Sequence, residues 1–204
     1  MAVERGAERA RAPYGKSTER RQQILDSAIE IFAREGVDAG SYRSVAAAIG
    51  VSHTALRYYF PTREELLIAV YRAHEHREDD EEWLGTAPSP VAALQESAAR
   101  NRAVPGLVKL YAALVSDAVQ AGHLASRAFI GRRFAQIRQR IARRVRLAQE
   151  QGAYPGDANA DDISSLIIAA SDGLQLQWLL DPDEVDVEKT LAVLNAALAT
   201  RDAS

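Results

Sequence analysis

The segment Ala47–Leu67, which reads AAIGVSHTALRYYFPTREELL, decides the fold of this chain. Gly50 interrupts an alanine-rich helical pattern, because glycine readily adopts the left-handed conformation that ends a helix. Two residues later Ser52 is a typical N-cap, so a new helix is expected to begin there. Pro61 ends this helix because proline has no backbone N–H to donate. Two short helices joined by so tight a turn are typical of a helix-turn-helix.

The residues before this segment predict the first helix of the same unit. From Ser17 or Thr18 onward, apolar residues recur at the spacing of one buried helical face, until Gly36 ends the helix. Ser41 is the expected N-cap of the second helix. We therefore expect residues 17–62 to form a three-helix head that contains the helix-turn-helix.

Residues 1–16 show no apolar periodicity and are expected to form a disordered arm. Glu4 and Glu8 partly cancel the basic charge of this arm, which favours a solvated tail. The alternative is an arm that contacts nucleic acid through Arg5, Arg9, Arg11 and Lys16.

The rest of the chain, residues 63–204, reads as helix throughout. No stretch alternates apolar and polar residues with a period of two, and no Asn-Gly or Asp-Gly hairpin turn occurs. The sequence thus predicts an all-α protein, in which the helix-turn-helix head is followed by a helical body. Turn and cap residues divide this body into expected helices over residues 63–84, 91–103, 106–121, 125–152, 161–180 and 183–200.

Composition and missing motifs exclude several classes of function. The chain has no cysteine, which excludes disulfides, thiol catalysis and cysteine-ligated metals. It has no Gly-rich phosphate loop and no nucleophile elbow, and His74 and His76 are too close in sequence to converge on one metal ion. We expect no enzymatic activity, no cofactor and no metal. We also expect a cytoplasmic location and no membrane partner, since no apolar run approaches about 20 residues and the N-terminus lacks the apolar core of a signal peptide.

Charge is distributed unevenly along the chain, whose net charge is −3. Residues 1–63 carry ten Lys or Arg against seven Asp or Glu, a balance of +3. Residues 64–204 carry fifteen against twenty-one, a balance of −6, and the two balances sum to −3. A modestly basic head on an acidic body indicates that the head contacts an anion.

The third helix of the head is the candidate reading helix. In a helix-turn-helix the first turn of the second helix reaches base edges in the major groove, and here that turn is short and polar. Arginine and tyrosine side chains at its far end suit the phosphates that flank the groove. The alternative is that the tyrosines are half-buried core residues and the arginines form a solvated face. The candidate DNA-binding residues are Ser41, Tyr42, Arg43, Ser52, His53, Thr54, Ala55, Arg57, Tyr58, Tyr59, Thr62 and Arg63.

Three motifs of the head resemble one known family. The stretches ILDSAIEIFAREG, SVAAAIGVS and LRYYFPTREELL, within residues 18–67, are similar to the DNA-binding head of the TetR family of bacterial transcriptional regulators. The resemblance implies that His53, Thr54 and Ala55 contact bases. It also implies that Arg43 reaches either guanine or phosphate.

The resemblance further implies phosphate contacts for Tyr59 and Arg63. Two positions depart from the family pattern. Arg57 replaces the usual tyrosine, so this contact is expected to be ionic rather than through a neutral hydroxyl. Tyr42 stands where a small aliphatic residue is common, and it either touches phosphate or packs against the head.

Family members dimerise through their last two helices, so the resemblance implies a homodimer that binds a palindromic operator in double-stranded DNA. Residues 161–180 are apolar on more than one side, as expected for a helix that packs against its own core and against a partner. The alternative is that the last helix only caps a monomeric body. The expected interface stripe consists of Ile163, Ile167, Ala170, Leu174, Trp178, Leu191, Leu194 and Leu198.

The resemblance also implies a pocket for a small-molecule effector in the body. Polar and aromatic residues in otherwise apolar helices are the candidates, with ordinary core packing as the alternative for each. The low aromatic content of the body argues against a stacking cage for planar cations. The arginines between residues 132 and 146 are expected to form a solvated face with local ion pairs, and the alternative is that this basic helix contacts nucleic acid. The candidate ligand-binding residues are Asn101, Tyr111, Phe129, Phe134, Asp172, Gln175 and Trp178.

Together these observations favour a ligand-responsive, sequence-specific DNA-binding regulator, expected to be a repressor that a small-molecule effector releases from its operator. The alternative is a helical module that binds a ligand or a protein and does not bind DNA. The helix that begins after Thr62 joins head to body, and by analogy with the family it is the expected lever between effector and operator.

Overall fold

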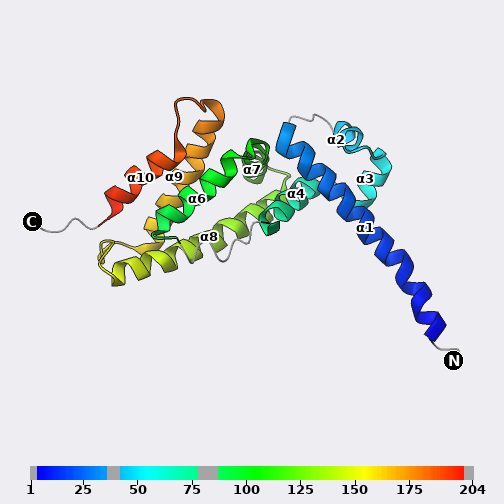
Figure 1. Ribbon diagram of the computed structural model, residues 1–204, viewed down its shortest axis with the longest axis horizontal. Coiled ribbons are helices and arrows are strands. Elements are labelled where there is room, and N and C mark those ends of the chain that lie inside the picture. The colour runs from blue at the N-terminus through cyan, green and yellow to red at the C-terminus, as the bar shows by residue number, and fades with distance from the viewer. Residues whose placement is uncertain (1–3, 36–41, 78–86, 200–204) are drawn as a thin grey trace, which may run out of the picture.

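The computed structural model describes residues 4–35, 42–77 and 87–199, and every regular element within these ranges is a helix, which confirms the predicted all-α class. The head lies at one end of an elongated molecule and the body at the other, with α4 between them (Figure 1). The helices are α1 (Glu4–Glu35), α2 (Tyr42–Ile49), α3 (His53–Tyr59), α4 (Arg63–Arg77), α6 (Pro90–Arg102), α7 (Pro105–Val119), α8 (Leu124–Glu150), α9 (Ala160–Leu180) and α10 (Val187–Leu198).

Two helices begin at least four residues away from the start that the sequence predicted. The arm expected over residues 1–16 is instead helical from Glu4 onward and continuous with the helix predicted from Ser17 or Thr18, although it contains Gly6, Pro13 and Gly15, which have low helix propensity. The last helix begins at Val187 rather than at residue 183, because the Asp186 side chain accepts a hydrogen bond from the Lys189 backbone N–H at 2.9 Å and caps it there. The expected N-cap Ser41 and residues 78–84 of the fourth predicted helix lie outside the described residues.

The tight turn between α2 and α3 forms as the local sequence predicts. Gly50 has a φ of 75°, the left-handed conformation that glycine adopts without steric cost. Ser52 then caps α3, since its Oγ accepts from the Ala55 N–H at 3.1 Å. Thr62 caps α4 in the same way, with its Oγ1 accepting from the Glu65 N–H at 3.1 Å.

One buried cluster runs from the head into the body. Leu56 of α3 and its C-cap Phe60 pack among apolar residues of α1 and α2, and the cluster continues through α4 into Leu110 of α7 and Phe129 of α8. The end of α1 lies so close to the start of α7 that a Cβ atom on Gly106 would sit 1.9 Å from a backbone oxygen of α1. The domain boundary predicted between residues 62 and 63 therefore crosses a continuous core.

A second buried cluster holds the far half of the body together. It is formed by α6, α8, α9 and α10, whose apolar side chains pack around Ile141, Ile167 and Leu191. Hydrogen bonds also connect α10 to the rest of this half, since the Ser89 and Tyr154 hydroxyls both donate to the Asn195 side-chain oxygen, at 3.0 and 2.9 Å. The body is thus a layered helical bundle in which α9 is central.

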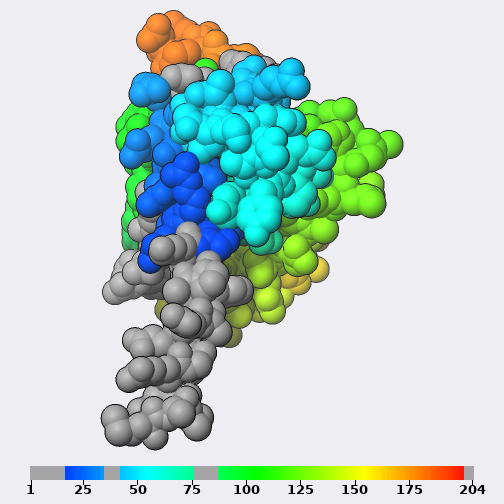
Figure 2. Space-filling view, turned by 90° about the vertical axis from the view of Figure 1, so that its right-hand side faces the viewer, coloured from blue at the N-terminus to red at the C-terminus, as the bar shows by residue number. Residues whose placement is uncertain are grey.

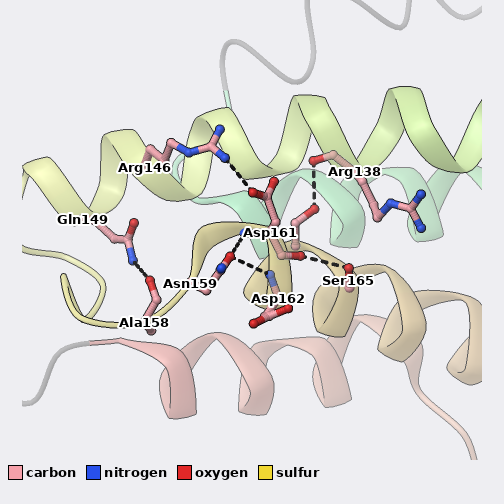
Figure 3. A network of polar contacts seen from close by, with 9 residues as sticks. Arg138, Arg146, Gln149, Ala158, Asn159, Asp161, Asp162 and Ser165 are labelled. Carbon is pink, nitrogen blue, oxygen red and sulfur yellow. Dashed lines mark hydrogen bonds and ion pairs between the residues drawn. The ribbon is translucent and has the colours of Figure 1, made fainter.

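Polar contacts fix α9 against α8 (Figure 3). Asn159 caps α9 by accepting from the backbone N–H groups of Asp161 and Asp162 at 2.8 and 3.3 Å. The Arg146 guanidinium pairs with the Asp161 carboxylate at 2.9 Å, and the Gln149 amide donates to the Ala158 carbonyl at 2.8 Å. The cap defines where α9 begins, and the contacts of Arg146 and Gln149 join α8 to the start of α9 and to the residue before its cap.

Candidate nucleic-acid interface and ligand cavity

The predicted reading helix, α3, is held from inside and open on the outside. Leu56 and Phe60 are buried in the head core, whereas Thr54 and Arg57 are exposed and 75% of Tyr58 is accessible. In the space-filling view, α2 and α3 form an outer face of the head (Figure 2). A short polar helix with one anchored side and one accessible side is suited to enter a groove.

Tyr42 packs within the head. Of the two roles expected for it, packing against the head and touching phosphate, this supports packing. Its hydroxyl donates to the backbone oxygen of Phe60, and the Leu56 oxygen lies 3.4 Å away. Partial burial raises the pKa of Tyr42 to about 12. The ring also meets the His53 ring edge-on at a centroid distance of 5.7 Å, so Tyr42 holds α2 against both ends of α3.

The other predicted DNA-binding residues differ in how exposed they are. Arg43, like Thr54, Arg57 and Tyr58, is exposed. Tyr59 is half-buried and meets the Tyr58 ring edge-on at 4.9 Å, so the core-packing alternative applies to Tyr59 and not to Tyr58. The partly buried members are His53, Ala55 and Arg63, and the capping hydroxyls are those of Ser52 and Thr62. Their contacts with DNA stay predictions, and Ser41 lies outside the described residues.

The body contains a cavity of about 100 Å³ between α4, α6, α7, α8 and α9. Four of the seven candidate ligand residues line it together: Asn101, Tyr111, Asp172 and Gln175. The other three lie elsewhere. Phe129 is buried in the cluster that runs from the head into the body. Phe134 lines a separate, more open hollow of about 240 Å³, and Trp178 lines one of about 10 Å³. The cavity is thus lined by the polar candidates and by Tyr111, whereas the other three aromatic candidates lie outside it.

The polar residues of the cavity are already hydrogen-bonded to one another. The Asn101 amide donates to the Gln175 side-chain oxygen at 2.6 Å, and the Tyr111 hydroxyl donates to Asp172 at 3.2 Å. Burial raises the pKa of the Asp172 carboxyl, although the nearby Arg133 charge and the tyrosine hydrogen bond oppose the shift. The cavity therefore contains a carboxylate that is costly to keep ionised.

Arg133 was assigned by sequence to a solvated face, and this is wrong. Its side chain is 27% exposed, forms an ion pair with Glu75, and places its guanidinium carbon 5.3 Å from the ring centroids of both Tyr71 and Tyr111. Burial alone lowers the pKa of Arg133, but Tyr71, Glu75, Tyr111 and the Asp172 carboxylate together raise it above its ordinary value.

This arrangement also overturns the argument from low aromatic content, since two tyrosines from different helices meet on one planar cation. The rings of Tyr71 and Tyr111 stack at 5.4 Å with an interplanar angle of 25°. One signal in the sequence points to it: Arg133 lies four residues before Ile137 and three after Ile130, on the edge of the inward stripe of α8. Overall composition cannot show that α4 and α7 bring their tyrosines to that edge.

The expected dimer stripe is the inward face of α9 and α10. Ile163, Ile167 and Leu191 are buried within the chain, so they are wrong as interface residues. The remaining members, Ala170, Leu174, Trp178, Leu194 and Leu198, are partly buried against the same core. Other apolar residues of these helices are exposed: Leu166, Ala169, Leu176 and Leu180 on one face of α9, and Val193 on α10.

By length and composition α9 is apolar enough to cross a membrane, and 28% of its most apolar window is buried. This is weak evidence for a membrane span, because α9 packs against α6, α8 and α10 in the body. Its hydropathy reflects two apolar faces, one turned toward the core and one exposed.

Comparison with known proteins gives two family matches. Residues 24–70 match the bacterial regulatory proteins of the tetR family, and residues 91–203 match the C-terminal part of BetI-type transcriptional repressors. The chain is similar to the transcriptional regulator BetI of Rhizobium meliloti, with 25% identity over 185 residues that cover 88% of this chain and 87% of BetI.

It is also similar to the transcriptional regulator RutR of Escherichia coli, with 32% identity over 123 residues that cover 60% of this chain and 52% of RutR, so the match spans about half the length of that relative. Among solved structures, a regulator from Saccharomonospora viridis in complex with choline superposes with a TM-score of 0.71 at 20% identity, covering 90% of this chain and all of the other. At that identity the likeness shows the shared fold.

Proposed function

This chain belongs to the TetR family of bacterial regulatory proteins, and on that basis we propose that it is a sequence-specific DNA-binding transcriptional repressor controlled by a small-molecule effector. The single observation that carries the proposal is the accessible outer face of α3, on a helix capped by Ser52 and anchored by Leu56 and Phe60. Thr54 and Ala55 in its first turn suit base edges, and Arg57 and Tyr58 suit phosphates.

The repressor acts as a homodimer in this proposal. The exposed apolar residues of α9, Leu166, Leu176 and Leu180, share one face of that helix, and Val193 extends the apolar surface onto α10. An apolar surface of this kind is typical of a protein–protein interface. Two copies related by a twofold axis present two reading helices to the half-sites of a palindromic operator in the cytoplasm.

The helix α4 links the effector cavity to the head. It begins at Arg63, directly after the reading helix, and it contributes Tyr71 and Glu75 to the cavity. An effector that binds one arrangement of α4 better than another shifts the spacing of the two heads, with a coupling free energy of about 1–3 kcal/mol. No catalytic step is part of this function.

The test is selection of bound sites from random DNA duplexes, followed by gel-shift titration over a salt series. The proposal expects a palindromic consensus, and an affinity that falls as salt rises because counterions are released from neutralised phosphates. The alternative, a helical module that does not bind DNA, predicts no enriched sequence. Absence of enrichment in the presence and absence of cell metabolites would overturn the repressor assignment.

A further inference from the structure

The cavity contains a position built for a cation, and a side chain of the protein itself fills it. The Arg133 guanidinium from α8 lies 5.3 Å from the centroids of both the Tyr71 and Tyr111 rings and pairs with Glu75. Asp172 completes the surroundings, held by the Tyr111 hydroxyl at 3.2 Å. Three helices, α4, α7 and α9, therefore supply two aromatic rings and two carboxylates around one positive charge from α8.

These groups favour a cation over an anion at this position. Aromatic faces and carboxylates both attract positive charge, and a desolvated cation–π contact is stronger than an exposed one. An anionic ligand would have to approach two carboxylates that are fixed on α4 and α9. Arg140 and His74 also line the cavity, so positive charge is available nearby, but it is the Arg133 guanidinium that lies against both tyrosine rings and pairs with Glu75.

We propose that the effector is a small organic cation, and that it binds between Tyr71, Tyr111, Glu75 and Asp172 by displacing the guanidinium of Arg133. This inference rests on the proposed function and names its effector class. Arg133 occupies the site in the free protein and acts as a tethered competitor. Only a cation that binds well enough to displace it reaches the site, which sets the concentration at which the repressor responds.

Displacement also has a structural consequence. The ion pair between Arg133 and Glu75 joins α8 to α4, the helix that begins next to the reading helix. When an external cation takes the place of the guanidinium, Glu75 is released from α8 and pairs with the ligand instead. The same event that fills the cavity therefore frees α4 to move relative to the body.

Methylguanidinium, which has the head group of arginine, is a suitable probe, and its binding is measured by calorimetry on the protein without DNA. The wild-type protein should bind it weakly, and Arg133→Gln should bind it roughly tenfold more tightly or better, because the apparent affinity no longer includes the cost of displacing the competitor. Adding Glu75→Gln to Arg133→Gln should abolish the gain. Acetate should bind neither protein.

The matched control is Arg140→Gln, a change of the same charge on the same helix and in the same cavity. It should raise methylguanidinium affinity only slightly, and equal gains in the two variants would show a general charge effect and overturn the proposal. Weaker methylguanidinium binding by Arg133→Gln, or acetate binding that depends on Arg133, would assign the site to an anion and overturn it as well.

Circular dichroism establishes that each variant is folded. If Arg133→Gln does not fold, the ring resonances of Tyr71 and Tyr111 are followed by NMR in the wild-type protein, where saturating methylguanidinium should shift both and unchanged resonances would contradict the proposal. Because no DNA is present, a negative result leaves DNA binding intact, and failure of operator selection leaves the cation site intact.

Discussion

The Glu64 carboxylate in the first turn of α4 accepts a hydrogen bond from the backbone N–H of Ser126 in the first turn of α8, at 2.6 Å. A helix leaves its first N–H groups without partners, and here a side chain from another helix supplies one. The His123 ring nitrogen lies 3.8 Å from the same carboxylate oxygen. Glu64 thus ties the head-side end of α4 to the helix that carries Arg133.

Replacing this cap should weaken the connection between α4 and α8. Glu64→Ala is expected to lower the free energy of unfolding by about 1 kcal/mol, since it leaves the Ser126 N–H without its partner. Glu65→Ala is the matched control, because the Glu65 side chain is exposed one position further along α4. Denaturant unfolding followed by circular dichroism measures both, and equal losses would show that Glu64 contributes only as a first-turn acid of α4.

The exposed arginine of the reading helix should contribute to DNA affinity through phosphate charge. Arg57→Ala is expected to reduce the slope of log affinity against log salt by about one, without a change in the preferred sequence. Arg143→Ala, an exposed arginine in the body, should leave the slope unchanged. Gel shifts on a selected duplex measure this slope, and identical slopes for Arg57→Ala and wild type would remove Arg57 from the phosphate contacts.

The outer face of α9 should control the oligomeric state. Leu176→Arg places a charge in the proposed interface while the side chain remains half exposed in one chain, so we expect a folded monomer in place of a dimer. Val119→Arg, an equally radical change at an exposed apolar position on α7, should leave the dimer intact. Light scattering after size-exclusion chromatography gives the masses, and a dimeric Leu176→Arg would place the interface elsewhere.

The contact between α1 and α7 should tolerate no side chain larger than hydrogen at Gly106. Gly106→Ala brings a Cβ atom to 1.9 Å from the Phe32 backbone oxygen, so it should destabilise the protein by about 2–3 kcal/mol. Gly131→Ala is the control in the middle of α8, where an added Cβ meets nothing within 4 Å. That substitution should stabilise the protein by about 0.5–1 kcal/mol, because alanine loses less backbone entropy than glycine in a helix. Thermal or denaturant unfolding of the pair would contradict this packing if both variants gained stability.

Burial of Asp172 should appear as a pH dependence of stability. The pKa of the Asp172 carboxyl is raised in the folded protein, so the folded state binds the carboxyl proton more tightly than the unfolded state does. Stability from this group is therefore present at low pH and is lost as pH rises from the ordinary aspartate pKa of about 3.9 through the raised folded value. The difference in unfolding free energy between wild type and Asp172→Asn should follow this curve, and a difference that grows in favour of wild type with rising pH would reverse the assignment.

Local chemistry made the head predictable from sequence. Gly50, Ser52 and Thr62 act on their own turns through backbone conformation and capping, so their positions are decided within a few residues of chain. The same holds for the inward position of Leu56, which follows from helical spacing. The start of α1 was missed because residues 4–16 lack apolar periodicity and contain Gly6, Pro13 and Gly15, which disfavour a helix.

Only the tertiary structure decided which faces and which side chains of the body helices are buried. The residues of α9 are apolar on two faces, and periodicity alone does not say which face meets the core. Packing against α6, α8 and α10 buries Ile163 and Ile167 and leaves Leu166 exposed. In the sequence, Arg133 is one of several arginines on its helix that are expected to form a solvated face. In the fold, α4 and α7 place Tyr71, Glu75 and Tyr111 against its guanidinium, although these residues are distant in sequence. Turns and caps depend on neighbours in sequence, whereas a buried charge depends on which helices surround it, and that is a property of the packed fold.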